Sequence, residues 1–185
     1  WLDPVDEPGP AHRELIRKLL EKRVPLFVCR SYHAVPPAGG RPWTALGDYG
    51  LKFMGRVVVQ KAYPSTHPLL LPIHDYAGHP LGNDLENSAC FFYGADVLEL
   101  GVAADPRLRS RVLGQTAGHP DIRGLKNFDA SQPEGPGGGK DVLPSPLITA
   151  ATVELETPEG HIPLLVALSS RGQLENRFID EGANR

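Results

Sequence analysis

Residues 147–168 read LITAATVELETPEGHIPLLVAL, and this stretch decides the predicted fold. Apolar and polar side chains alternate through both halves, which is the period of a strand with one buried face. The four residues 157–160, with the sequence TPEG, are typical of a connection between two antiparallel strands. The pattern therefore predicts a hairpin in which 147–155 pairs with 162–168. The side chains expected in the core are Val153, Leu155, Leu164 and Val166.

Upstream of this hairpin, the sequence predicts helices. Residues 11–22 place leucine and isoleucine on one face and charged side chains on the other. Asn83 followed by Glu86 matches a variant of the capping box, and the apolar spacing after it predicts a helix to about Ala103. The pair 105–106, Asp-Pro, has the cap and first-turn chemistry of another short helix.

Strands are expected in two further apolar runs, and together the elements indicate a fold class. Residues 24–29 have the length of a strand, and 56–60 have the β-branched density of a central one. Residues 173–179 could add a third strand to the hairpin. Helices in the middle and an antiparallel meander at the C-terminal end predict one α+β domain that spans 1–185.

Length and composition narrow the class of protein. The 185 residues are 41% hydrophobic and 22% charged, which are values typical of globular proteins. The net charge of −3 gives no basic surface that would indicate a nucleic-acid partner. No apolar run approaches the length of a membrane span. Cys29 and Cys90 are expected to be free thiols. Because the chain opens on Trp1, we expect a processed product or a domain excised from a larger protein, in a compartment that the sequence leaves open.

The segment 115–143 is predicted to be a loop. Its core, QPEGPGGGKD at 132–141, is the most flexible-looking part of the chain, and the flexible loop is placed at 131–146. Deletion of 133–140 is therefore expected to be tolerated. The glycines and Lys140 lack the spacing of a phosphate-binding loop, so that interpretation is rejected.

The proline-rich stretch 64–82 concentrates groups that could carry chemistry. It contains His67, His74, Asp75 and His79, and imidazole and carboxylate groups are ligands for zinc, iron or manganese. A separation of five residues would put His74 and His79 about 140° apart on a helix, so shared ligation needs loop geometry. The alternative is that these histidines brace the loop by satisfying backbone carbonyl groups.

Two further residues are candidates for the same site. The sequence AGHP occurs at 77–80 and again at 117–120, so His119 would have the same local geometry as His79. Tyr76 is the other candidate helper. The predicted catalytic residues are His74, Asp75, His79 and His119, and the predicted metal ligands are His67, His74 and His79.

These groups lead to two hypotheses for function. The first is an enzyme, a hydrolase or an oxygenase or other oxidoreductase, that depends on a divalent metal or haem and acts on a small molecule or peptide. Without a metal, His74 would act as a general base oriented by Asp75. The second is a non-catalytic binding module, excised from a larger and possibly secreted protein, that contacts a protein partner. An enzyme should bring at least two of the histidines together in one pocket, whereas a module should satisfy each separately.

Overall fold

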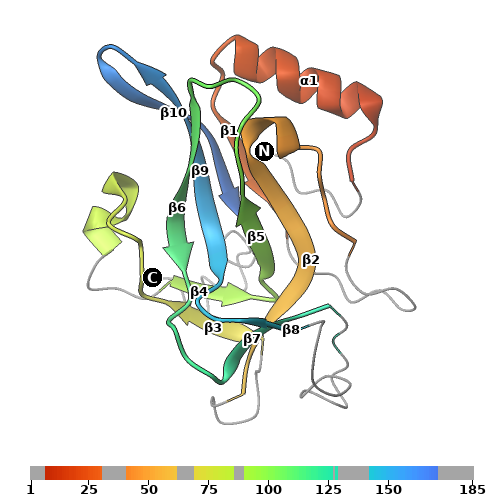
Figure 1. The fold of residues 1–185 in the computed structure, drawn as a ribbon, viewed down its shortest axis with the longest axis vertical. Helices are drawn as coiled ribbons and strands as arrows, with labels where there is room; N and C mark the ends of the chain where they lie inside the picture. Colours follow the sequence, from red (N-terminus) through yellow and green to blue (C-terminus); the bar gives the residue numbers. More distant parts are fainter. Residues whose placement is uncertain are drawn as a thin grey trace, which may run out of the picture.

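The computed structural model describes residues 7–30, 41–61, 69–85, 90–126, 128 and 142–170. These residues form a β-rich fold of ten strands, one α-helix and two short 3-10 helices (Figure 1). In chain order the elements are α1 (Pro10–Glu21), β1 (Leu26–Cys29), η1 (Gly47–Tyr49), β2 (Leu51–Gln60), β3 (Leu70–Ile73), η2 (Pro80–Leu85), β4 (Cys90–Tyr93), β5 (Asp96–Leu100), β6 (Leu108–Gln115), β7 (Ile122–Leu125), β8 (Val142–Pro144), β9 (Ile148–Thr157) and β10 (Gly160–Leu168). No helix among the described residues is long and apolar enough to span a membrane.

Strand β9 is the element around which the main sheet is arranged. One edge of β9 pairs with β10 and the other with β6, and both pairings are antiparallel. β10 in turn pairs with β1, which is parallel to it. β5 meets β9 at Ile148 and continues the sheet through β2 and β7 to β8. β3 and β4 form a separate antiparallel pair.

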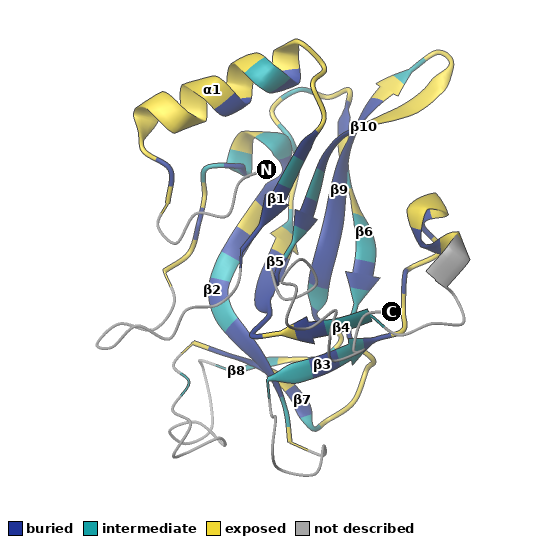
Figure 2. Ribbon diagram, turned by 180° about the vertical axis from the view of Figure 1, so that it is seen from behind, coloured by how far each residue is buried: buried dark blue, intermediate teal, exposed yellow. Residues whose placement is uncertain are grey.

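Both faces of β9 are buried, because each carries its own hydrophobic cluster (Figure 2). Ala151, Val153 and Leu155 face the larger cluster, into which Leu20 of α1 also packs. Ala150, on the opposite face, packs with side chains of the β3–β4 pair. Full burial of a valine or leucine stabilises a fold by about 1.5–3 kcal/mol, so these alternating positions hold the layers together.

The predicted α+β class with central helices is wrong, because strands make up the middle of the described chain. The helix expected over 83–103 is replaced by the end of η2, then β4 and β5. Gly94, between the two strands, has a φ of 58°, which no helix accommodates. The aromatic run 91–93 suits a pleated strand, and β4 and β5 find partners in β3 and β2. The apolar residues of β4 and β5, two short strands in succession, happen to have the spacing of one face of a helix.

Two other expectations in this region also differ from the structure. A helix was predicted after Asp105, but this part of the chain is strand β6. Leu108, its first residue, is buried, whereas Arg109 and Arg111 are exposed. The loop predicted over 115–143 contains β7 and the start of β8. Its glycine-rich part, 131–141, lies outside the described residues, as does the strand expected at 173–179.

The N-terminal helix, the first two strands and the C-terminal hairpin are confirmed. α1 begins at Pro10, and β2 begins five residues before the expected run. β9 and β10 pair as predicted, with Val153 and Leu164 buried. Val166, however, is only half-buried, because a register shift between Pro163 and Leu165 places Leu165 in the core instead. The two cysteines are free, as predicted.

A buried ion pair connects the end of β1 with the start of β5. Nη1 of Arg30 lies 2.9 Å from Oδ2 of Asp96, and both side chains are almost fully buried. Oδ1 of Asp96 accepts the backbone N–H of Arg56 at 2.8 Å. The guanidinium group of Arg30 also lies 5.7 Å from the ring centre of Phe53. Burial raises the pKa of Asp96 to about 6, although Arg30 and the backbone hydrogen bonds act in the opposite direction.

This shifted pKa predicts a pH dependence of stability. The pKa of Asp96 is about 6 in the folded chain, against about 3.9 in an unfolded chain. The folded state therefore binds the proton more tightly, and this group's contribution to stability falls as the pH rises from about 4 to about 6. Asp96→Asn does not titrate at this position, so the free energy of unfolding of the wild type minus that of Asp96→Asn, measured with urea, should be smaller at about pH 7 than at about pH 4.5. An equal difference at both pH values would contradict the shift.

Candidate functional site

The loop between β3 and η2 carries Asp75 and His79 in a closed turn. Oδ1 of Asp75 accepts the N–H of Ala77 at 2.8 Å, and Oδ2 accepts the side-chain amide of Gln115 at 2.6 Å. Ala77 and Gly78 then adopt positive φ values of 51° and 64°, which reverse the chain direction. Asp75 thus fastens the turn to β6, and the reversal directs His79 towards the sheet.

His79 is buried and makes contacts through both ring nitrogens. Nε2 lies 2.8 Å from Oε1 of Glu154 and 3.1 Å from Oγ1 of Thr152, both on β9. Nδ1 accepts the backbone N–H of Leu81 at 3.1 Å. Because Nδ1 accepts this hydrogen, the ring proton resides on Nε2 and is donated to Glu154. Neither nitrogen is left with a lone pair directed at a substrate.

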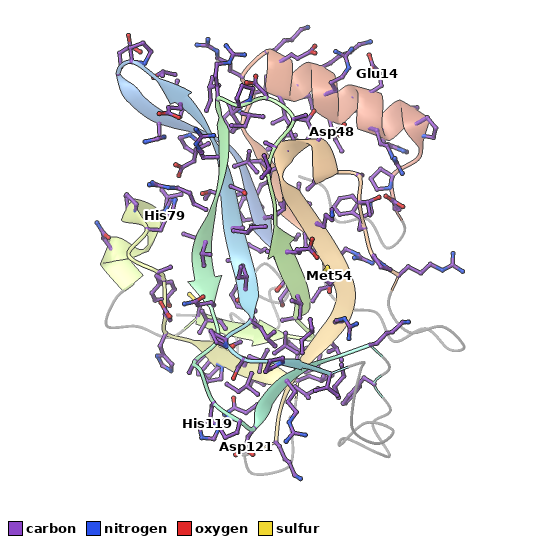
Figure 3. The ribbon with its side chains drawn as sticks, viewed as in Figure 1. Glu14, Asp48, Met54, His79, His119 and Asp121 are labelled. Carbon is purple, nitrogen blue, oxygen red and sulfur yellow. The ribbon has the colours of Figure 1, made fainter. Side chains whose placement is uncertain are left out.

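Glu154 is the acidic centre of this cluster. Its Oε2 has no hydrogen-bond partner among the described groups. It lies 3.5 Å from Nη1 of Arg111 and 4.0 Å from Nδ1 of His161, two exposed side chains of β6 and β10. The guanidinium group of Arg111 therefore lies close enough to offset the charge of the buried carboxylate. Figure 3 shows His79 beside β6, where it fastens the loop to the sheet.

The structure brings His74, Asp75 and His79 to one small hollow, but it does not bring His119 to them. His74 and Asp75 are exposed, and with His79 they line a small hollow of about 110 Å³. His119 is exposed at the end of the molecule opposite α1, far from His79 (Figure 3). His67 lies outside the described residues. Within the described ranges, no three His, Cys, Asp or Glu side chains form a group that could hold a metal ion. A chemical role for these individual residues stays a prediction.

Tyr76, the other predicted helper, is a buried connection between β3 and β4. Its hydroxyl group donates to the backbone carbonyl of Ile73 at 3.0 Å and accepts the N–H of Cys90 at 3.2 Å. Burial is the main cause that raises the pKa of Tyr76 to about 12. The hydroxyl group is therefore protonated at neutral pH and serves the packing of the β3–β4 pair.

A larger cleft lies at the other end of the sheet, beneath the C-terminal end of α1. Its volume is about 430 Å³, and its walls come from α1, η1, the β5–β6 loop and the β9–β10 hairpin. The floor is made of the buried leucines Leu20, Leu108, Leu155 and Leu164. The rim is made of the charged residues Arg17, Glu21, Arg23, Asp48, Asp105 and Arg107.

The rim of the cleft combines paired and unpaired charges. Nη2 of Arg107 lies 2.7 Å from Oδ2 of Asp105, and these hydrogen bonds lower the pKa of Asp105 to about 2. Arg17 likewise pairs with acidic neighbours on α1. Arg23 and Asp48 form no ion pair or side-chain hydrogen bond with any other described residue. In Figure 3, Asp48 lies just below α1. Within the part of the chain that the structure describes, the cleft therefore has one unpaired charge of each sign.

Gly50 is what allows the β5–β6 loop to form a wall of this cleft. Its φ is 75°, and a Cβ atom there would lie 2.7 Å from the carbonyl oxygen of Gly101. The close approach lets the N–H of Gly101 donate to the carbonyl group of Gly50 at 2.9 Å. The next residue of this loop, Val102, is 95% exposed. Val102 thus projects from the same loop whose later residues, Ala104 and Asp105, line the cleft.

Sequence reasoning missed the cleft because its walls come from four separate parts of the chain. The amphipathic pattern of 11–22 identified Leu20 as a buried residue. The pattern does not show that a cleft lies between this face of the helix and the sheet. Because a helix was wrongly predicted after Asp105, neither Leu108 nor the β5–β6 loop before it was recognised as part of a cleft. The local signal was at 101–106, where a glycine opens a connection, GVAADP, that closes with Asp-Pro.

Comparison with known proteins identifies the fold. No family model matches the sequence, and no curated protein matches it significantly. Among solved structures, the mmIFT52 N-terminal domain is similar, with a TM-score of 0.53 and 15% sequence identity. The match covers 100% of this chain and 71% of that domain's chain. At this identity, the likeness shows a shared fold.

The predicted metal- or haem-dependent hydrolase or oxidoreductase is wrong. The described residues contain no group of metal-binding side chains, and the fold is shared with the mmIFT52 N-terminal domain. The buried histidine of the predicted site is held by Glu154 and Leu81, in the way expected of a brace. A small-molecule substrate is unsupported for the same reasons.

Proposed function

We propose that this chain is a non-catalytic module that binds a partner protein. The observation that carries the proposal is the cleft, where a floor of buried leucines is surrounded by charged side chains. Protein interfaces have this composition, with an apolar centre that excludes water and a polar rim. The expected occupant is an apolar side chain of the partner, flanked by an acidic and a basic residue.

The charges of the rim support a protein occupant. Arg23 and Asp48 remain open for cross-interface pairing, whereas a small-molecule site usually has a few polar groups that converge on one ligand. Val102 gives the partner a further apolar contact. The separate satisfaction of His79 and His119 also fits a module, since His119 accepts the N–H of Asp121 at 3.2 Å. The similarity to a domain of a larger protein is consistent with this proposal.

A photo-cross-linking experiment tests where the partner binds. A photoreactive amino acid is placed at Val102, and at Arg123 as a control on the exposed surface of β7. We expect one discrete cross-linked protein from Val102, and the purified pair should bind saturably. Equal cross-linking from both positions, or binding that does not saturate, would count against the proposal.

Val102→Asp should weaken this binding without affecting the fold. Val102 is 95% exposed, so the free energy of unfolding should stay within about 0.5 kcal/mol of the wild type. A charge at an apolar contact should raise the Kd for the purified partner by at least ~10-fold. The matched control is Leu81→Asp, because Leu81 is also an exposed apolar residue, 53% exposed, but lies on η2. An equal effect of the two changes would argue against the cleft.

A further inference from the structure

Strand β6 forms an edge of the main sheet, and its backbone groups alternate in direction. The N–H of Glu156 donates to the carbonyl group of Arg107 at 2.8 Å, just before β6 begins. The β6–β9 register continues without a shift from Leu108 to Val112. In an antiparallel pair, every second residue directs both backbone groups at its partner strand. Arg109 and Arg111 therefore direct theirs at β9.

The residues between these arginines direct their backbone groups away from the sheet. These are Ser110 and Val112, and both are half-buried. Their backbone N–H and C=O groups have no hydrogen-bond partner among the residues that the structure describes. A row of such groups is a template for one more strand.

The open part of this edge has defined limits. At its start, the N–H of Leu108 donates to the carbonyl group of Asp105 at 3.0 Å. At its end, the N–H of Gln115 donates to the carbonyl group of Asp75 at 2.9 Å, where the loop before η2 meets β6. Between these two points, Ser110 and Val112 are the residues in the regular register that direct their backbone groups outward.

The outer edge of β10 differs, because it is protected against such pairing. β1 pairs with β10 from Leu165 onwards, so the hairpin extends beyond β1. Pro163 lies in this extension and has no N–H to donate, and the register shifts beside it. β6 contains no proline, and its register is regular up to Val112. Of these two edges, β6 is the one suited to accept a strand.

The charges on β6 indicate what kind of strand it accepts. Arg109 and Arg111 are exposed on one face, and β6 carries no acidic residue. Arg109 lies 3.4 Å from Glu156, and Arg111 lies 3.5 Å from Glu154. Both glutamates belong to β9. A second copy of β6 would bring the arginines of both copies together, and like charges on paired strands are destabilising. Acidic residues on an added strand would instead complete rows of alternating charge.

We infer that the outer edge of β6 binds an extended segment of a partner protein that carries Glu or Asp at alternate positions. The segment adds a strand to the sheet through the backbone groups of Ser110 and Val112, and its acidic side chains lie beside Arg109 and Arg111. This inference rests on the proposed function, since it names a second contact for the partner. The edge begins beside the cleft, because Leu108 of β6 lines the cleft floor. The edge acts through backbone groups and the cleft through side chains, so each can be tested with its own variants.

The test uses synthetic peptides and the full 185-residue chain. One peptide, of about six residues, the usual strand length, alternates Glu with Val, and a second alternates Lys with Val. We expect the Glu peptide to shift the NMR signals of the Ser110 and Val112 amides and to slow their hydrogen exchange. The Lys peptide should bind at least ~10-fold more weakly, and added salt should reduce the difference.

Two changes to the backbone separate strand addition from simple charge attraction. Val112→Pro removes an outward N–H but keeps the hydrogen bonds of Arg109 and Arg111 to β9, so it should abolish peptide binding, whereas Val112→Ala should retain it. Glu peptides that are N-methylated on alternate residues provide a test that leaves the protein unchanged. Methylation of the amides that face β6 should abolish binding, and methylation of the other set should not.

The outcomes separate this inference from the proposed function. Equal binding of the Glu and Lys peptides, peptide shifts confined to the cleft, or dimerisation of the chain through β6 would overturn the edge inference. The cross-link from Val102 would be unaffected by those results. Conversely, a partner insensitive to Val102→Asp would overturn the cleft, while peptide binding at Ser110 and Val112 would still stand.

Discussion

Replacement of Asp96 by alanine is expected to lower the free energy of unfolding by about 3–5 kcal/mol. The cause is the buried guanidinium group of Arg30, which would lose the carboxylate 2.9 Å away. The N–H of Arg56 would also lose its acceptor. Urea unfolding at neutral pH measures the loss. The pair itself need not stabilise the fold, because burial makes ionisation of Asp96 unfavourable.

Two variants establish whether the loss comes from a buried charge that has lost its carboxylate. Asp105→Ala removes an aspartate that also pairs with an arginine, at 2.7 Å, but on the exposed rim of the cleft. It should leave the unfolding curve almost unchanged. The double variant Arg30→Met/Asp96→Asn removes both charges and retains an acceptor for Arg56. It should recover most of the stability lost in Asp96→Ala, and a double variant no more stable than Asp96→Ala would refute the explanation.

His79→Ala is expected to lower the free energy of unfolding by about 3 kcal/mol, because buried Glu154 would lose its shortest hydrogen bond and keep only the longer one from Oγ1 of Thr152, at 3.3 Å. The distance from Nε2 to Oε1 is 2.8 Å, and both side chains are nearly inaccessible to solvent. The N–H of Leu81 would lose its acceptor as well. Thermal or urea unfolding measures the change.

His74→Ala is the matched control for His79→Ala. His74 belongs to the same loop but is exposed, so its removal should change stability by less than ~0.5 kcal/mol. His79→Gln should recover part of the loss, because the glutamine amide can donate to Glu154 from a similar position. Equal losses for His74→Ala and His79→Ala would contradict the brace. Hydrogen exchange of the loop should quicken in His79→Ala alone.

The parts of the fold that the sequence predicted are those determined by local pattern. The alternation in β9 and β10 is strict enough to identify the hairpin, and the helical face of 11–22 is continuous. The register shift after Pro163 leaves no local signal, so Val166 was predicted to be buried in place of Leu165. Between 90 and 115 the apolar spacing fits a helix and a strand equally well. There the long-range pairing with β2 and β9 decided the outcome.

The candidate site was predictable in its residues but not in its role. The sequence drew attention to His79 because of the prolines and glycines around it. Its partner Glu154 lies 75 residues away in the chain, so no local spacing could relate the two. The cleft also combines separate parts of the chain, and Arg23 and Asp48 both line it only because α1 packs on the sheet. Such sites depend on tertiary contacts.

The parallel pairing of β1 with β10 has a consequence for how the chain folds. Leu26 pairs with Leu165, so β1, the first strand in the described chain, can pair only after β10, the last strand, has been synthesised. Contacts between such distant residues require closure of a large loop, which slows folding. During synthesis on the ribosome, Val28 and the apolar face of α1 stay exposed until the C-terminal hairpin emerges. A truncation that removes β10 would leave β1 without its strand partner in the sheet.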